Sequence, residues 1–124
     1  MHQFEKLKIW QKAMNIAEKT YTISAELPTD EKFNLIHQIK KCAVSIPSNI
    51  AEGSGRNSKK EFIHFLGIAN GSSFELITQM MLLKRLNIVT EDKITDIIND
   101  LIEVCNMSYA LQKSLKLTSA NPNS

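Results

Sequence analysis

The first candidate for chemistry in this sequence is an acid followed by a histidine at helical spacing. Glu61 and His64 match Glu-x-x-His, the pattern that holds metal in di-iron and di-manganese helical bundles. Such a site needs a second pair of this kind and a glutamate from each of two further helices. Since no other glutamate in the sequence has a histidine three residues later, we expect no metal site, no cofactor and no catalytic residue.

The second candidate is a line of hydrogen-bonding side chains on both sides of Pro47. Their spacing of three or four residues places them on one face of a helix, opposite an apolar face. With one residue from a later helix they form a group that we name the polar stripe: Gln38, Lys41, Ser45, Asn49, Glu52, Arg56 and Glu75. We interpret it first as a hydrogen-bonded belt between helices, because buried polar groups must find partners. A surface that recognises a partner chain or nucleic acid is the second interpretation, and a catalytic role is the least favoured.

The polar stripe is predicted to face the following helix. Residues 54–57 form a short turn, so the segments on either side of it fold back on each other as a hairpin. Counting back from this turn at the rise of a helix predicts which residues lie level with each other. It gives three cross-helix pairs: Glu52 with His64, Lys40 or Lys41 with Glu75, and Ser45 with Ala69 and the small residues after it.

Three small basic clusters supply the candidate nucleic-acid contacts: Lys40 and Lys41; Arg56, Lys59 and Lys60; Lys84 and Arg85. Aromatic residues are not interleaved with these clusters, so base stacking is not indicated. Free amides at a helix start beside Arg56 could bind a phosphate. A helix stop surrounded by solvated charges is the favoured interpretation of that turn. The net charge of +2 is too small to demonstrate a polyanion partner by itself.

The composition is typical of one globular domain with few connections. The 124 residues are 43% hydrophobic and 23% charged, with only 4 glycines and 3 prolines. Neither Cys42 nor Cys105 belongs to a Cys-x-x-Cys or Cys/His cluster, so we expect buried, reduced thiols in a cytoplasmic protein. The first residues lack the apolar run of a signal peptide, and no segment is long and apolar enough for a membrane span.

Hydrophobic periodicity predicts an all-α, antiparallel up-down-up-down four-helix bundle over residues 1–117. The helices are expected at about 5–26, 30–53, 58–86 and 91–116, and residues 118–124 are expected to form a disordered tail. Thr29 is expected to cap the second helix, which Pro47 should kink without ending. Ser58 and Glu61 form a capping box that starts the third helix. Trp10 and Tyr21 fall on the predicted core face of the first.

The last two helices carry more apolar residues than a lone bundle needs to bury. Residues 80–83 read Met-Met-Leu-Leu without interruption, and the fourth helix has apolar residues on more than one stripe. A helix in a single bundle needs one such stripe. The surplus favours self-association.

The segment from Ala43 to Arg56 resembles the four-helix bundle protein family, as do residues 58–62 and 68–75 after it and residues 4–13 before it. This family includes the proteins encoded in bacterial 23S rRNA intervening sequences. The accessory variability proteins of diversity-generating retroelements are similar to them. The family motif falls on Gln38, Lys41, Ser45, Asn49, Glu52, Gly53, Arg56, Gly71, Ser72 and Glu75.

The resemblance implies a bundle that assembles into a ring-like homopentamer and has no catalytic activity. For the retroelement members it also implies a basic surface that binds nucleic acid and a reverse transcriptase. We therefore predict a non-enzymatic, homo-oligomeric scaffold or adaptor, with RNA, DNA or a nucleic-acid enzyme as candidate partners. A small-molecule or metal-binding four-helix bundle is the alternative prediction.

Overall fold

The computed structural model describes residues 3–28 and 35–119, and these residues form helices joined by turns. A short 3-10 helix, η1 (Phe4–Lys6), precedes the four long helices α1 (Lys8–Ala25), α2 (His37–Ser54), α3 (Lys59–Arg85) and α4 (Glu91–Ser119). The predicted all-α class with four long helices is confirmed. None of the described helices combines the length and the apolar character that crossing a bilayer requires.

Two of the observed helix ends, the start of α1 and the end of α4, differ from the predicted ones by several residues. α1 begins at Lys8 because the preceding Leu7 is extended, with φ −71° and ψ 124°. The predicted start of the second helix at residue 30 and its cap at Thr29 lie outside the described residues. α4 continues to Ser119, so residues 118 and 119, which were predicted to belong to the disordered tail, are helical. Residues 120–124 of that tail also lie outside the described part of the chain.

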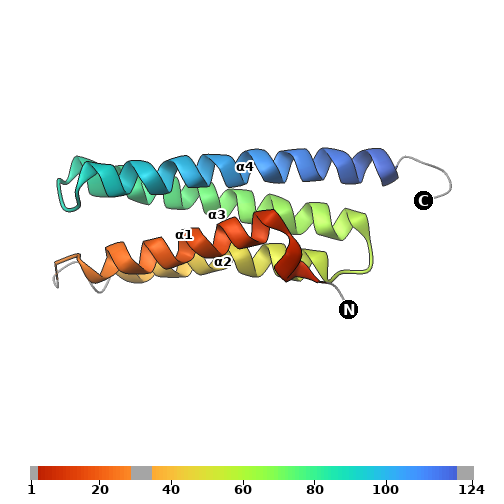
Figure 1. Cartoon of the computed structure of the whole chain (residues 1–124), viewed down its shortest axis with the longest axis horizontal. Helices are drawn as coiled ribbons and strands as arrows, with labels where there is room; N and C mark the ends of the chain where they lie inside the picture. Colours follow the sequence, from red (N-terminus) through yellow and green to blue (C-terminus); the bar gives the residue numbers. More distant parts are fainter. Residues whose placement is uncertain (1–2, 29–34, 120–124) are drawn as a thin grey trace.

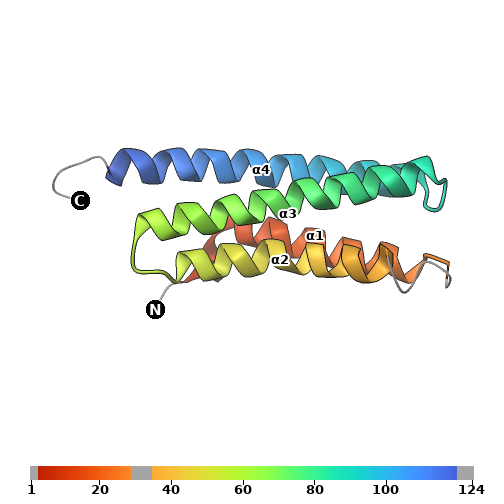
Figure 2. The same cartoon turned by 180° about the vertical axis from the view of Figure 1, so that it is seen from behind.

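The four helices lie side by side around one core (Figures 1 and 2). α1 packs on α2, α2 on α3, α3 on α4, and α4 back on α1. Ion pairs between α1 and α4 join Lys12 to Glu103 and Lys19 to Asp96. Because the residue number rises along α1 as it falls along α4, these two helices run in opposite directions. The bundle therefore has four sides, each formed by two neighbouring helices, which we name by those helices: α1/α2, α2/α3, α3/α4 and α1/α4.

The core consists mainly of isoleucine and leucine side chains from all four helices: Ile16, Ile39, Ile46, Ile50, Leu66, Leu76, Leu83, Ile94, Ile97 and Leu101. The predicted inward stripe of α1 is displaced, because Thr20 and Ile23 are buried where Tyr21 was expected. Tyr21 is 45% exposed, so its assignment to the core is wrong. Trp10 is half-buried at the edge of the core and packs edge-on against Phe4. The aromatic side chains of Trp10 and Tyr21 are thus partly exposed on the surface of α1.

Two local features of the α2–α3 hairpin follow from single residues. α2 continues through Pro47 and does not end there, as predicted. The predicted cap of α3 is confirmed, because the Glu61 amide donates to the Ser58 hydroxyl at 3.1 Å. The Glu61 carboxylate turns back to the same hydroxyl, at 3.5 Å. The capping box fixes where α3 begins.

Glycine allows the two helices of the hairpin to approach closely beside this turn. A Cβ atom placed on Gly53 would lie 2.7 Å from the Phe65 Cβ and 3.0 Å from the Phe62 ring. The neighbouring Gly55 has more space, with its nearest atom 3.6 Å from such a Cβ. Gly53 therefore sets the distance between α2 and α3 at this end of the bundle.

Candidate interaction surfaces

The centre of the polar stripe lies against α3 on the α2/α3 side. The Ser45 and Ser72 hydroxyls lie 2.5 Å apart, and the Cys42 thiol donates to the Ser72 carbonyl at 3.0 Å. Ser72 follows Ala69 by three residues, as the hairpin register predicts. A hydrogen bond from a side chain to a helical carbonyl of the next helix requires close backbone approach. The small side chain of Ser72 leaves room for that approach.

The N-terminal part of the stripe lines a hollow between α2 and α3. The hollow is formed by Gln38, Lys41, Cys42, Ser45 and Glu75. Lys41 and Glu75 share this hollow, but within the described residues no ion pair joins Glu75 to Lys40 or Lys41. Lys40 instead places its ammonium group 5.0 Å from the centre of the Tyr21 ring. Of the two lysines predicted to lie near Glu75, Lys41 shares its hollow, whereas Lys40 turns to an exposed aromatic ring of α1.

The surroundings of the Cys42 thiol in this hollow favour its protonated form. Burial raises the pKa of Cys42 to about 12, and the nearby negative charge of Glu75 raises it further in the same direction. Burial also raises the pKa of Cys105. Since the thiolate is the reactive form, both free cysteines stay protonated at neutral pH. They contribute packing and, for Cys42, a hydrogen bond.

The C-terminal part of the stripe makes its polar contacts within α2 and the turn that follows it. The Asn49 amide donates to the Ser45 carbonyl at 2.7 Å, and Arg56 pairs with Glu52 at 2.7 Å. The predicted pairing of Glu52 with His64 is wrong, because Arg56 one helical turn away reaches the carboxylate first. The Arg56 guanidinium also lies 4.8 Å from the centre of the Phe65 ring.

The Glu-x-x-His pattern does not converge with other ligands. Glu61 is engaged by Ser58 at the start of α3, while His64 lies edge-on to Phe65, with ring centres 5.6 Å apart. Among residues 3–28 and 35–119, no group of three or more His, Cys, Asp or Glu side chains is arranged to hold a metal ion.

The three predicted basic clusters do not form one surface. Arg56, Lys59 and Lys60 lie at the end of the bundle where α2 turns into α3, whereas Lys84 and Arg85 lie at the opposite end. Lys40 and Lys41, in the first turn of α2, also lie toward that opposite end. Lys84 is paired with Glu91 at 3.0 Å. Any polyanion contact therefore has to be assigned to one end of the molecule.

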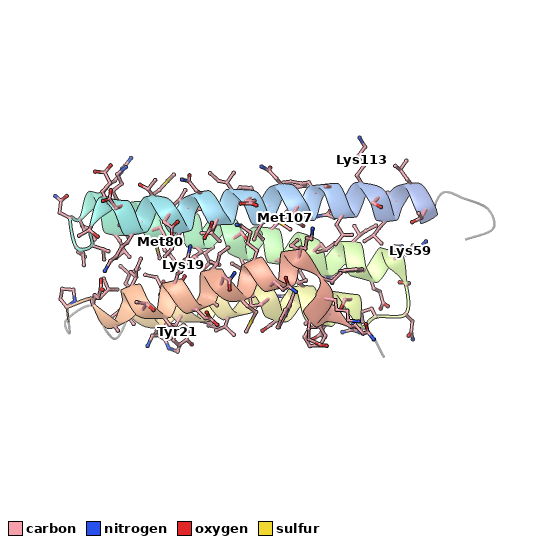
Figure 3. The ribbon with its side chains drawn as sticks, viewed as in Figure 1. Lys19, Tyr21, Lys59, Met80, Met107 and Lys113 are labelled. Atoms are coloured by element: carbon pink, nitrogen blue, oxygen red, sulfur yellow. The ribbon has the colours of Figure 1, made fainter. Side chains whose placement is uncertain are left out.

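Sequence reasoning missed the lysines of α4 that lie at the same end of the bundle as Arg56, Lys59 and Lys60. Ser108 of α4 contacts the Leu66 carbonyl, so the last turns of α4 lie beside the first turns of α3. Figure 3 shows Lys59 and Lys113 toward the same end of the bundle. We name this region the basic end, and its cations are Lys6, Lys8, Arg56, Lys59, Lys60, Lys113 and Lys116. The carboxylates of this region are Glu5, Glu52 and Glu61, so cations outnumber acids.

Residues 5–110 match the family described as 23S rRNA-intervening sequence protein. The match runs from η1 through most of α4 and includes the whole polar stripe. The chain belongs to this family. The family resemblance that the motif around Pro47 indicated is thereby confirmed.

A solved structure of the same kind supports the fold of this family member. It is the crystal structure of a protein with unknown function from the S23 ribosomal protein family of Bacteroides thetaiotaomicron VPI-5482. The two chains are 26% identical, with a TM-score of 0.79, and the similarity covers 85% of this chain and 98% of the other. No curated protein sequence matches the chain.

The α3/α4 side of this 23S rRNA-intervening sequence family member is apolar and uncovered. Phe74 and Met81 of α3 and Ile102 and Tyr109 of α4 keep 47% to 52% of their surface exposed. Phe74 and Met81 are seven residues apart, as are Ile102 and Tyr109, so each pair lies on one stripe of its helix. The predicted surplus of apolar residues in the last two helices thus has a defined location.

The α1/α2 side carries a second apolar surface, shaped as a groove. It is lined by Trp10, Met14, Ala17, Val44, Pro47, Ser48 and Ala51. Tyr21 follows Met14 by seven residues on the same edge of α1, and Figure 3 shows it pointing away from the bundle. Sequence reasoning placed Trp10 and Tyr21 in the core and therefore missed this groove.

The α1/α4 side is closed by ion pairs between its two helices. Lys12 contacts Asp100 and Glu103, Lys19 contacts Asp96 and Asp100, and Figure 3 shows Lys19 between the helices. At the end of α1, Glu26 pairs with Lys93 at 2.6 Å. The charges of this side are thus already neutralised within one chain.

Proposed function

We propose that the protein is a non-enzymatic scaffold that works as a ring-like homo-oligomer in the cytoplasm, with five copies as the favoured number. The observation that carries the proposal is the half-exposed apolar surface of the α3/α4 side. A contiguous group of large apolar side chains that the fold leaves exposed is typical of a surface through which proteins associate. The free, protonated thiols agree with a reducing compartment.

A scaffold role agrees with the state of the side chains that could otherwise react. The Cys42 thiol is protonated, Glu61 caps a helix, and Asp100 lies between two lysines. Each of these groups has a structural partner within the chain. The proposal therefore assigns the protein binding and assembly, with no reaction of its own.

The homo-oligomer predicts a mass well above that of one chain. Five copies of the 14.0 kDa chain would give about 70 kDa in light scattering coupled to size-exclusion chromatography. The measurement is made at micromolar protein concentration and repeated after dilution. A mass of one chain at all concentrations would contradict the proposal.

We further propose that RNA, DNA or the nucleic-acid part of a ribonucleoprotein contacts the basic end. Seven cations meet three carboxylates there, although the whole chain has a net charge of only +2. The positive charge is therefore concentrated at the end of the bundle where η1 and the start of α1 lie with the end of α2, the start of α3 and the end of α4. In a ring, every copy would present such an end, and repeated weak contacts increase the overall affinity.

Replacing Lys59 and Lys60 together by alanine is expected to weaken binding of a structured RNA in fluorescence anisotropy. Counterion release makes log Kd depend on log salt concentration, and two lost phosphate contacts would lower that slope by about 1 to 2. The matched control replaces Lys84 and Arg85, a basic pair at the opposite end, and should retain both affinity and slope. Equal losses in the two variants would contradict the assignment to the basic end. Absence of binding by the wild-type chain at low salt would remove the nucleic-acid part of the proposal.

A further inference from the structure

We propose that each copy of the chain docks its α3/α4 side into the α1/α2 groove of the next copy, an inference that rests on the homo-oligomer proposed above. The occupant of the groove is a second copy of the same chain. The contact joins two different surfaces, which makes it heterologous. Heterologous contacts form closed rings when the rotation between copies closes.

The α3/α4 side has the apolar area that such a contact needs. Its four large side chains are about half exposed, and fully burying side chains of this size removes roughly 150 to 250 Å² each. Together they therefore offer on the order of 400 Å² of apolar surface. A stable interface covers about 800 Å² per partner, of which slightly more than half is apolar. One side of the bundle thus supplies most of the apolar part of one standard interface.

The α1/α2 groove has a shape and composition that can receive these side chains. Its lining is almost wholly apolar, with Val44 and Pro47 of α2 facing Trp10 and Met14 of α1. Val44 is 42% exposed, so the groove is open from outside. Aromatic side chains that enter an apolar pocket of a partner are typical anchors of protein interfaces. Phe74 and Tyr109 have the size and exposure for this role.

The two apolar sides lie on opposite faces of the bundle. In the cyclic order of the helices, the pair α1 and α2 is opposite the pair α3 and α4. Figure 3 shows this arrangement, because Tyr21 points away below α1 and Lys113 points away above α4. The α1/α4 side between them is ion-paired, and the α2/α3 side carries the polar stripe. A copy can therefore contact one neighbour on each apolar side while its two polar sides stay uncovered.

Two glycines on the outer stripe of α3 leave room for another chain. Gly67 and Gly71 precede Phe74 by seven and three residues, so all three lie on one stripe. A Cβ atom added at either glycine would meet nothing within 4 Å in the single chain. Glycine weakens a helix interior relative to alanine, and packing within the chain does not account for this pair. A second copy lying close against this stripe accounts for it.

The inference is tested by blocking each side in a separate variant. Phe74→Glu places a charge on the α3/α4 side and Val44→Glu places one in the groove, at positions exposed enough to keep the fold, which circular dichroism checks. Each variant alone is expected to be a 14.0 kDa monomer in light scattering. An equimolar mixture is expected to contain dimers, because the intact groove of one variant accepts the intact α3/α4 side of the other.

The matched control is Ile68→Glu, which changes an apolar residue on the α2/α3 side of α3 whose exposure of 40% is close to the 42% of Val44. Ile68 precedes Ser72, which contacts α2, by one helical turn, and this variant should keep the wild-type mass. If each single variant were instead a dimer by itself, like surfaces would pair with like, and the inference would be wrong. Loss of assembly in the control to the same extent would overturn it as well.

Cross-linking in the assembled protein provides a second readout that leaves the apolar side chains unchanged. Thr78→Cys and Ser48→Cys place thiols beside Phe74 and in the groove. A short bis-maleimide should join a mixture of the two variants, and neither variant to itself. A wild-type oligomer without this cross-link would overturn only the assignment of the two sides. A monomeric wild-type chain would overturn the proposed homo-oligomer itself, so the two failures are distinguishable.

Discussion

Gly53→Ala is expected to lower the free energy of unfolding by about 1 to 3 kcal/mol, as for other substitutions that overpack a core. The new Cβ would lie 2.7 Å from the Phe65 Cβ, closer than carbon atoms can approach. Phe65 cannot relieve this contact by rotating, because its Cβ is fixed to the backbone of α3. The two helices must therefore move apart, and this outweighs the gain of up to about 1 kcal/mol that alanine brings to a helix.

The control for this substitution is Gly55→Ala, two residues further along the same turn. A Cβ there would meet only the Glu52 and Ala51 carbonyls at 3.6 and 3.7 Å, which are ordinary contacts. We expect its midpoint in urea unfolding to stay close to that of the wild-type chain, while the midpoint of Gly53→Ala falls. A midpoint for Gly53→Ala equal to or above the wild-type value would show that α3 can move away from the new Cβ without loss of stability. The close approach of the helices would then not depend on glycine.

Gly53 also illustrates what the sequence can and cannot predict about the fold. Periodicity places Gly53 near the end of a helix, and the structure agrees, with α2 ending at Ser54. Its close contact with Phe65 depends on how two helices pack, and a pattern within one helix does not contain that distance. The same reason explains α1, where two adjacent apolar stripes compete. The predicted stripe included Tyr21, but packing against α2 and α4 buries Thr20 and Ile23 instead.

The candidate surfaces were predictable to a different degree. Hairpin register brought Ser45 to the small residues of α3, because both helices are rigid near their shared turn. The same register failed for Glu52, because a flexible arginine one turn away competes for the same carboxylate. The basic end required knowing where α4 finishes beside α3, which depends on the packing of the whole bundle. Only the structure shows that Lys113 and Lys59 approach the same end.

Asp100→Asn is expected to destabilise the chain by about 1 to 2 kcal/mol near neutral pH, between the values for exposed and buried ion pairs. Asp100 lies between Lys12 and Lys19, with Oδ–Nζ distances of 3.4 and 2.8 Å, and its side chain is only 18% exposed. Burial alone would raise the pKa of Asp100. The hydrogen bonds and charges of Lys19 and Lys12 outweigh this effect and hold the pKa below its ordinary value of 3.8. The substitution removes a charge on which two lysines depend.

The pH dependence of this difference separates the charge from packing. A carboxyl group whose pKa is lowered by folding stabilises the folded state above its unfolded pKa and loses that contribution as pH falls through its folded pKa. The difference between wild type and Asp100→Asn should thus be constant from pH 5 to 9 and shrink below a pH of about 4. Hydrogen bonds to carboxylates raise the pKa of both lysines above the ordinary value of 10.5. The bond to Glu103 has the largest effect on Lys12, and the bond to Asp100 has the largest effect on Lys19. Their contribution should therefore be lost only at still higher pH.

A graded control comes from Asp96, which pairs with Lys19 and is 57% exposed. Asp96→Asn should cost less than about 1 kcal/mol, because exposed ion pairs are screened by solvent. Thermal melts of the three proteins across this pH range, at low and high salt, measure both differences. If Asp100→Asn remained destabilising by the same amount at pH 2, its effect would come from altered packing between α1 and α4. In that case side-chain packing would hold α1 against α4. If the stability difference between wild type and Asp100→Asn instead disappears at low pH, the ion pairs hold the two helices together.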